Sequence, residues 1–216
     1  MNYMSGRSFF YIAFLIIFGG ALYFFFFSDP PPPVTNFPPK GTKVLVLGDS
    51  LSEGVGASQT DKAYIGLLES RLGVTIINRG RSGDTTGMAL ARYDSDVAPE
   101  KPDILIVLLG GNDYLRRLPQ EETFRNLRAI IERAHKDGAV VLLLGVRGGL
   151  LNDKFDNDFR DLAEEMHVLF VPNVLDGIIG HAELMADQIH PNDRGYALVA
   201  DKVEPALRSL VGSILH

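Results

Sequence analysis

The sequence predicts a three-layer α/β/α domain built on a sheet of five parallel strands. Two observations lead to this fold class. Short runs rich in Val, Ile and Leu recur after residue 42, and stretches with helical spacing of apolar residues separate them. Strands that alternate with helices in this way form parallel βαβ units, whose helices cover both faces of the sheet. We find no internal repeat and no second globular domain in the sequence.

The apolar runs have the length and composition of strands that are buried on both faces. We expect strands at Val44–Leu47, Val74–Ile77, Ile104–Leu109, Val140–Leu144 and Val168–Val171. The amphipathic stretches have the length of ordinary helices. We expect helices at Lys62–Leu72, Thr85–Asp96, Glu121–Lys136, Asn157–Met166 and Asp193–Val211.

An uncharged apolar segment precedes this domain. Residues 9–27 contain no charged side chain, and a transmembrane helix needs about 20 apolar residues. We therefore expect an uncleaved transmembrane anchor here. Bulky rings from Phe24 to Phe27 stand where a cleaved signal peptide requires small residues. A cleaved signal peptide and a buried core helix remain the alternatives.

Charges on either side of this segment predict its orientation. Arg7 precedes the segment and Asp29 follows it, so the positive-inside rule places residues 1–8 in the cytoplasm. The prolines of residues 28–41 predict a stiff linker. The domain at residues 42–216 would then lie outside the cytoplasm in a single-pass membrane protein, in the periplasm if the organism is Gram-negative. Cleavage of the segment would make the domain a secreted protein.

Composition excludes several classes of protein. The formal net charge of the chain is −6. Residues 1–40 carry +1, from Arg7, Lys40 and Asp29, so the rest of the chain carries −7. An acidic domain without basic runs argues against a nucleic-acid partner. The absence of cysteine removes disulfides, thiolate metal sites and a cysteine nucleophile. The sequence has no spacing of metal ligands, no phosphate-binding loop and no complete dinucleotide-binding motif. It does not predict an oligomeric state.

Polar residues and glycines lie in the loops where the expected strands end. Ser50 follows the first strand, Gly83 lies in the loop after the second, and Asn112 follows the third. A further loop, which contains Asp187 and His190, precedes the last helix. Because the carboxyl ends of parallel strands meet at one edge of a sheet, we expect these four segments to converge on one crevice.

These residue types together permit ester hydrolysis through a serine. The reaction needs a hydroxyl, a base for its proton and a group that orients the base, and Ser50, His190 and Asp187 match these roles. It also needs donors for the oxyanion, and the N–H groups of Ser50 and Gly83 and the amide of Asn112 are candidates. Each residue alone is explained equally well as a turn, cap or surface residue. The prediction therefore depends on their convergence.

Four blocks of the sequence resemble the SGNH, or GDSL, hydrolase superfamily. In chain order they are Gly48-Asp49-Ser50-Leu51, Gly83, Gly111-Asn112-Asp113 and Asp187-x-x-His190. Their surroundings look like those of the bacterial arylesterase branch, which includes thioesterase and lysophospholipase enzymes. The resemblance implies a flavodoxin-like sheet, a Ser50–His190–Asp187 triad and no metal or organic cofactor. It also implies an oxyanion hole formed by Ser50, Gly83 and Asn112.

Three more residues are candidates for substrate contact. Asp49 directly precedes the expected nucleophile, where the resemblance implies that it shapes the turn. Leu150 and Leu151 follow the fourth strand, where members of this branch often have a loop over the acyl chain. These two leucines could contact an apolar acyl group. An ordinary lead-in to the next helix explains them equally well.

We therefore expect a serine esterase that hydrolyses small acyl esters, thioesters or lysophospholipids close to the membrane that anchors it. A carbohydrate O-acetylesterase that acts on cell-wall or surface polysaccharide is the alternative with the same chemistry. A non-catalytic ligand-binding module is the alternative from another class, although the complete set of site residues argues against it. The sequence does not predict the physiological substrate, the acyl length or the leaving group.

Overall fold

A computed structural model describes residues 33–146 and 154–213, and these residues contain one sheet of five parallel strands. The strands are β1 (Val44–Gly48), β2 (Ile76–Gly80), β3 (Ile104–Leu108), β4 (Val140–Leu144) and β5 (Leu169–Val171). Their order in the sheet is β2-β1-β3-β4-β5. The five-stranded parallel sheet that the sequence predicts is thus confirmed.

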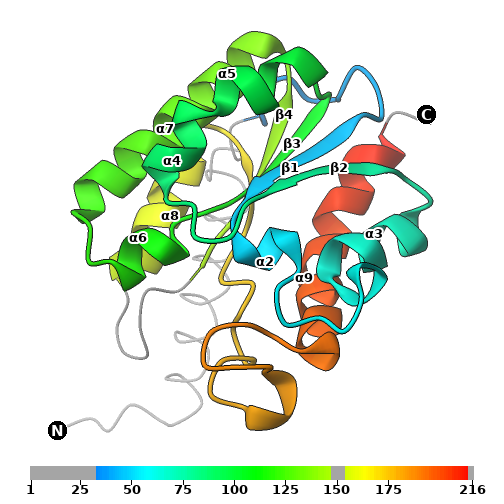
Figure 1. The fold of residues 1–216 in the computed structure, drawn as a ribbon. Helices are drawn as coiled ribbons and strands as arrows, with labels where there is room; N and C mark the ends of the chain where they lie inside the picture. The colour runs from blue at the N-terminus through cyan, green and yellow to red at the C-terminus, as the bar shows by residue number, and fades with distance from the viewer. Residues whose placement is uncertain (1–32, 147–153, 214–216) are drawn as a thin grey trace, which may run out of the picture. The chain divides into compact units, whose positions relative to one another are not determined.

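Helices cover both faces of this sheet (Figure 1). On one face lie α3 (Tyr64–Leu72) and α9 (Asp193–Gly212), which pack against each other. The other face carries α4 (Thr86–Ala91), α5 (Tyr93–Asp96), α7 (Gln120–Asp137) and α8 (Lys154–Glu165). Two short helices, α2 (Ser50–Glu53) and α6 (Gly111–Leu115), begin at the carboxyl ends of β1 and β3. Short 3₁₀ turns occupy Thr60–Lys62, Ala98–Glu100 and Ala182–Leu184.

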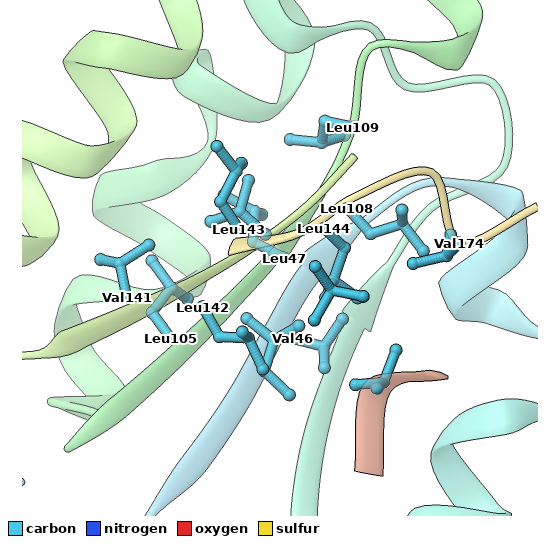
Figure 2. Close-up of a cluster of buried hydrophobic side chains, with 14 of the residues drawn as sticks. Val46, Leu47, Leu105, Leu108, Leu109, Val141, Leu142, Leu143, Leu144 and Val174 are labelled. Carbon is cyan, nitrogen blue, oxygen red and sulfur yellow. The ribbon is translucent and has the colours of Figure 1, made fainter. Parts of the chain in front are cut away.

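The three central strands form the middle of the core. Every residue of β1, β3 and β4 is buried. Figure 2 shows their Val and Leu side chains on both sides of the sheet, where the two helical layers cover them. This double burial explains why these segments appear in the sequence as continuous apolar runs instead of alternating ones.

Several predicted elements differ from the structure at their boundaries, and two of these differences have a clear physical reason. Gly73 ends α3 in the left-handed conformation, with φ 66°, so β2 starts at Ile76 and not at Val74. The strand then continues to Gly80 because its polar residues pair with β1 at the edge of the sheet, where one side remains open to solvent. The single helix expected at residues 85–96 is divided at Arg92 into α4 and α5.

The predicted transmembrane helix, and the single-pass location with an exported domain that was inferred from it, have to be corrected. Among residues 33–146 and 154–213, no helix is both long enough and apolar enough to cross a bilayer. The longest described helices, α7 and α9, have 18 and 20 residues, but each carries charged side chains on the face turned away from the sheet. Residues 9–27, to which the prediction applied, lie outside the described residues.

Part of the predicted linker contacts the amino-terminal edge of the sheet. The Thr35 N–H donates to the carbonyl of His167 at 2.8 Å. The Asn36 side chain donates to the carbonyls of His135 and Ala139, both at 3.0 Å. His167 lies two residues before β5, His135 is in the last turn of α7, and Ala139 directly precedes β4. All three carbonyls therefore lie near the amino-terminal ends of strands, opposite the expected crevice. The division into residues 28–41 and 42–216 stays a prediction.

Candidate active site

Ser50 begins helix α2 directly at the carboxyl end of β1. The Asp49 carboxylate caps this helix by accepting a hydrogen bond from the Leu51 N–H at 3.0 Å. A side chain at Gly48 would be impossible, because its Cβ would lie 2.1 Å from the Ser52 Oγ. The close approach of α2 to β1 therefore requires this glycine, and it fixes the hydroxyl of Ser50 at the sheet edge where ligands bind in α/β folds.

His190 connects Ser50 with Asp187. Its Nε2 lies 3.0 Å from the Ser50 Oγ, and its Nδ1 lies 2.7 Å from the Asp187 Oδ2. The other Asp187 oxygen accepts hydrogen bonds from the N–H groups of Ile189 and His190, both at 2.8 Å. The hydrogen bond from the His190 side chain, together with those from the two N–H groups, lowers the pKa of Asp187 to about 2. An ionised Asp187 favours the His190 tautomer that carries its proton on Nδ1, which leaves Nε2 as the acceptor for the Ser50 proton.

The loop after α2 holds the His190 loop in place. Ser58 donates twice to the carboxylate of Asp193, from its N–H at 2.7 Å and from its hydroxyl at 2.6 Å. Gly56, with φ 95°, approaches so closely that a Cβ there would lie 2.5 Å from the carbonyl oxygen of Pro191. The sequence prediction missed Ser58, Asp193 and Gly56. Gly56 had a signal, since it lies six residues after Ser50 in a short glycine-containing segment that no ligand motif explains.

Hydrogen bonds of Asn112 link the three residues that are expected to supply the oxyanion donors. The Asn112 Nδ2 donates to the Asp84 carbonyl at 3.0 Å and to the Asp49 Oδ2 at 3.3 Å, so it bridges the neighbours of Gly83 and Ser50. The N–H groups of Ser50 and Gly83 make no hydrogen bond with any described residue. Two free backbone donors beside a nucleophile are what an oxyanion hole requires.

Asp49 has a structural position behind these groups. Its side chain is 3% exposed, and burial raises its pKa to about 6, against the opposing effect of the Leu51 N–H. Both carboxylate oxygens already accept protein hydrogen bonds, one from Leu51 and the other from Asn112. Asp49 does line the cavity described below, but this geometry agrees better with a role in shaping the turn. Its substrate-binding role stays a prediction.

A buried arginine joins the loops that follow β1 and β2. Arg92 donates from Nη2 to the carbonyls of Gly48 at 3.2 Å and Arg79 at 2.7 Å. Its Nε donates to the Asp84 Oδ2 at 2.6 Å, and its Nη1 donates to Asp96 at 2.9 Å. Arg92 is the residue between α4 and α5, and its side chain is directed into the sheet edge. The sequence prediction missed Arg92, which there resembles an ordinary charged residue of a helix.

A cavity of about 380 Å³ lies in front of the strand ends, and Ser50, Asn112 and His190 are in its wall. The rest of its wall is largely hydrocarbon. The apolar residues that contribute are Leu51, Tyr114, Leu115, Val146, Leu175, Ile179 and Ile189. The sequence prediction did not assign any of them to substrate contact, although Leu51 and Ile189 lie within motif blocks and Tyr114 and Leu115 directly follow one. Leu150 and Leu151, which were expected to contact substrate, lie outside the described residues.

Residues 46–198 match the GDSL-like Lipase/Acylhydrolase family, and this range contains the predicted triad and the three oxyanion candidates. The chain belongs to this family. The resemblance that the motif blocks predict is therefore confirmed. In the described part of the chain, no group of three or more His, Asp or Glu side chains is arranged to hold a metal ion.

The chain aligns with several relatives over most of their length. Esterase TesA of Pseudomonas aeruginosa is 33% identical over 179 residues, which are 78% of this chain and 89% of the relative. Thioesterase 1/protease 1/lysophospholipase L1 of Escherichia coli is 32% identical over 176 residues, 78% of this chain and 84% of the relative. The esterase EstA from Pseudoalteromonas sp., whose crystal structure was determined inhibited by monoethylphosphonate, has a TM-score of 0.72 at 26% identity and covers 80% of this chain and 100% of its own. The protein is a serine hydrolase that acts on ester bonds, as the sequence predicts.

Proposed function

We propose that this esterase hydrolyses esters and thioesters of medium-length acyl chains, including lysophospholipids, with Ser50, His190 and Asp187 as its catalytic triad. The observation that carries this proposal is the apolar cavity that opens beside the Ser50 hydroxyl. Ligand sites are typically apolar hollows with a few polar groups at the reacting end. An acyl chain fits this description, since its only polar group is the carbonyl that meets the nucleophile.

The first half-reaction begins with proton transfer from Ser50. The Ser50 Oγ attacks the acyl carbonyl carbon while His190 Nε2, 3.0 Å away, accepts the hydroxyl proton. The carbonyl electron pair moves onto oxygen and creates a tetrahedral oxyanion. The charged imidazole that results is stabilised by Asp187, which stays ionised at all but strongly acidic pH because of its low pKa.

Three donors stabilise the oxyanion in this proposal. The N–H groups of Ser50 and Gly83 are available without breaking any hydrogen bond to a described residue. The Asn112 amide is engaged with Asp84 and Asp49, and its longer bond, the one to Asp49 at 3.3 Å, is the one that is exchanged for the oxyanion. Loss of one such donor typically lowers kcat by about 100-fold to 1,000-fold.

Collapse of the tetrahedral intermediate releases the alcohol or thiol. The bond to the leaving group breaks, and His190 gives its proton to the departing oxygen or sulfur. Water then attacks the acyl-enzyme, with His190 as the base, and the bond to Ser50 breaks as His190 returns the proton to the Ser50 Oγ. The products are a carboxylic acid and the free hydroxyl of Ser50.

An acyl-length series tests this function in the full-length protein. With p-nitrophenyl esters from acetyl to dodecanoyl, we expect kcat/KM to rise to a maximum at a medium chain length, because longer chains bury more apolar surface in the cavity. Ser50→Ala is expected to reduce kcat by at least about 1,000-fold and to abolish labelling by a fluorophosphonate. Undiminished hydrolysis by Ser50→Ala would refute the mechanism.

The same series separates the carbohydrate O-acetylesterase from the acyl esterase. An acetyl group would leave most of a cavity of about 380 Å³ unfilled. A sharp maximum at the acetyl ester would therefore refute the medium-chain proposal and favour the deacetylase. Absence of both hydrolysis and labelling in the wild-type protein would favour the non-catalytic module.

A further inference from the structure

The residue that follows Asn112 in α6 carries a buried carboxylate. Asp113 is 1% exposed, and it accepts two hydrogen bonds from Thr86, one from the backbone N–H at 2.9 Å and one from the hydroxyl at 2.6 Å. Thr86 is the first residue of α4, and the N–H groups in the first turn of a helix have no partner within that helix. Asp113 therefore supplies the acceptor that this N–H requires.

Two residues of α7 complete this network. The Thr123 Oγ1 donates to the Asp113 Oδ1 at 3.3 Å, and the Asn126 Nδ2 donates to the Thr86 Oγ1 at 3.2 Å. Thr86 and Thr123 are buried as Asp113 is, so water does not compete for the bonds between these three side chains. Hydrogen bonds are electrostatically stronger in such an interior than in water. The network therefore holds α4, α6 and α7 together near the site.

Helix α6 holds the loop that carries Gly83 at three points. The Gly83 carbonyl accepts from Arg116 at 2.7 Å, and the Asp84 carbonyl accepts from Asn112 at 3.0 Å. The Asp113 carboxylate is the third point. Arg116 is exposed to solvent, and in the proposed mechanism Asn112 exchanges one of its bonds for the oxyanion. Of the three attachments, the one at Asp113 is buried and stays the same throughout the reaction.

We propose that Asp113 is a positioning residue that sets the separation between two oxyanion donors, the Gly83 N–H and the Asn112 amide. Gly83 lies three residues before Thr86 and Asn112 directly precedes Asp113, so short stretches of backbone connect both donors to this carboxylate. Donors that are already in place cost no reorganisation when charge develops on the substrate oxygen. Asp113 does not line the cavity, so it acts through its neighbours. This inference rests on the proposed function, since it takes Gly83 and Asn112 as oxyanion donors.

The experiment compares Asp113→Ala with Asp113→Asn in the full-length protein. Ala leaves the Thr86 N–H without an acceptor. Asn keeps an oxygen for this N–H, and its NH₂ can donate to the Thr86 and Thr123 hydroxyls, which are able to accept as well as donate. With a p-nitrophenyl ester, we expect Asp113→Ala to lower kcat by about tenfold to a hundredfold with little change in KM. Asp113→Asn is expected to keep at least about a third of the wild-type kcat.

A boronic acid, which mimics the tetrahedral intermediate, provides a second measurement. Its affinity is expected to fall in Asp113→Ala by about the same factor as kcat, because both depend on the oxyanion donors. A boronic acid affinity equal to that of the wild type would overturn the proposal.

A double-mutant cycle with Asn112→Ala separates this role from a general loss of structure. If Asp113 acts through the oxyanion donors, Asp113→Ala costs less when the Asn112 amide is already absent. We expect its effect on kcat to be at least about threefold smaller in the Asn112→Ala background than in the wild type. An equal effect in both backgrounds, or a wild-type kcat in Asp113→Ala, would overturn the role of Asp113 alone. An unchanged kcat in Asn112→Ala would overturn the proposed oxyanion hole together with this inference.

Two threonine variants complete the test. Thr86→Val removes the hydroxyl bond to Asp113 from the loop side, so it carries the test if Asp113→Ala does not fold. We expect it to lower kcat by about threefold or more, and an unchanged kcat would overturn the proposal. Thr123→Val is the matched control, since it removes a hydroxyl from the same carboxylate but no hydrogen bond of residues 83–86. It is expected to lower the melting temperature and to leave kcat unchanged, whereas a loss of kcat equal to that in Thr86→Val would show that Asp113 is only structural.

Discussion

In the proposed mechanism Asp187 orients His190 through one short hydrogen bond, so Asp187→Asn tests the position of a single proton. In Asp187→Asn the side-chain NH₂ can donate to Nδ1, which favours the tautomer with its proton on Nε2 and removes the acceptor for Ser50. We expect kcat to fall by up to about 10,000-fold, with a smaller change in KM and in melting temperature. Steady-state kinetics of the variant and the wild type measure the changes in kcat and KM. Glu183→Gln is the matched control, since Glu183 is an exposed carboxylate of the same segment and its side chain lies 3.7 Å from the His181 ring. If Asp187→Asn kept more than a tenth of the activity, the orienting role would be refuted.

The charge state of Asp49 couples folding to pH. Burial raises its pKa from 3.8 to about 6, so between these pH values the folded protein binds a proton that the unfolded chain has released. The stability that the neutral carboxyl contributes is therefore present at pH 4 and is lost as the pH rises through 6. This pKa difference corresponds to on the order of 3 kcal/mol.

We predict that Asp49→Asn gains stability relative to the wild type as the pH increases from 4 to 7. Asn keeps an acceptor for the Leu51 N–H but has no proton to lose in this range. The free energy of unfolding is measured in denaturant at both pH values for both proteins, so that all other titrating groups cancel. The difference between variant and wild type is expected to change by about 2–3 kcal/mol. A difference that does not change with pH would contradict the raised pKa.

At the scale of elements, the loop between β2 and α4 is held at every residue that precedes Asp84. The Arg81 N–H donates to Gly48, Ser82 donates twice to Glu53, and the Gly83 carbonyl accepts from Arg116. Arg92 supplies the buried contact, through the Asp84 carboxylate and the carbonyls at the ends of β1 and β2. The Gly83 N–H therefore has a fixed direction before substrate binds, as electrostatic stabilisation of an oxyanion requires.

Arg92→Lys tests this preorganisation. Lys keeps a positive charge beside Asp84, but it cannot reproduce the planar set of donors that reaches both strand ends. We expect kcat to fall by about tenfold to a hundredfold with little change in KM, and the affinity for a boronic acid, which mimics the tetrahedral intermediate, to fall in parallel. Arg79→Lys is the control, since Arg79 contacts Glu100 and the Asp96 carbonyl but none of the site loops with its side chain. A loss of melting temperature without a change in kcat would show that Arg92 is only structural.

Across the whole domain, the carboxyl ends and the amino ends of the strands have different roles. The carboxyl edge carries the site, and the amino edge carries contacts that close the fold, among them the bonds from Asn36 to the carbonyls of His135 and Ala139. Asn36→Gly keeps the left-handed backbone, with φ 61°, and removes both bonds. We expect it to lower the free energy of unfolding by about 1–3 kcal/mol and to leave kcat and KM unchanged. A changed kcat at full stability would contradict this separation of the two edges.

The sequence predicts the centre of the fold and the chemistry better than the surroundings of the site. The buried strands β1, β3 and β4 are continuous apolar runs, and Ser50, Asn112 and His190 lie in blocks with recognisable spacing. Helices α2 and α6 were not predicted, because four or five residues are too few to show a helical period. Contacts between distant segments, such as those of Arg92 and the cavity wall, leave no periodic signal either. The anchor prediction was wrong: it depended on a local apolar run alone, and no helix of the described residues is both long enough and apolar enough to cross a bilayer.

The bond between His190 and Ser50 joins residues that are 140 positions apart in the chain. On a ribosome, the amino-terminal part of a chain leaves first and can fold first. In the proposed mechanism, a nascent chain that has emerged as far as β5 holds the serine and both backbone donors of the oxyanion hole, but it has no base to activate the serine. On this proposal, hydrolysis begins only when the segment before α9 has been made and has docked. The appearance of esterase activity during synthesis would report the completion of the fold and not merely the presence of the nucleophile.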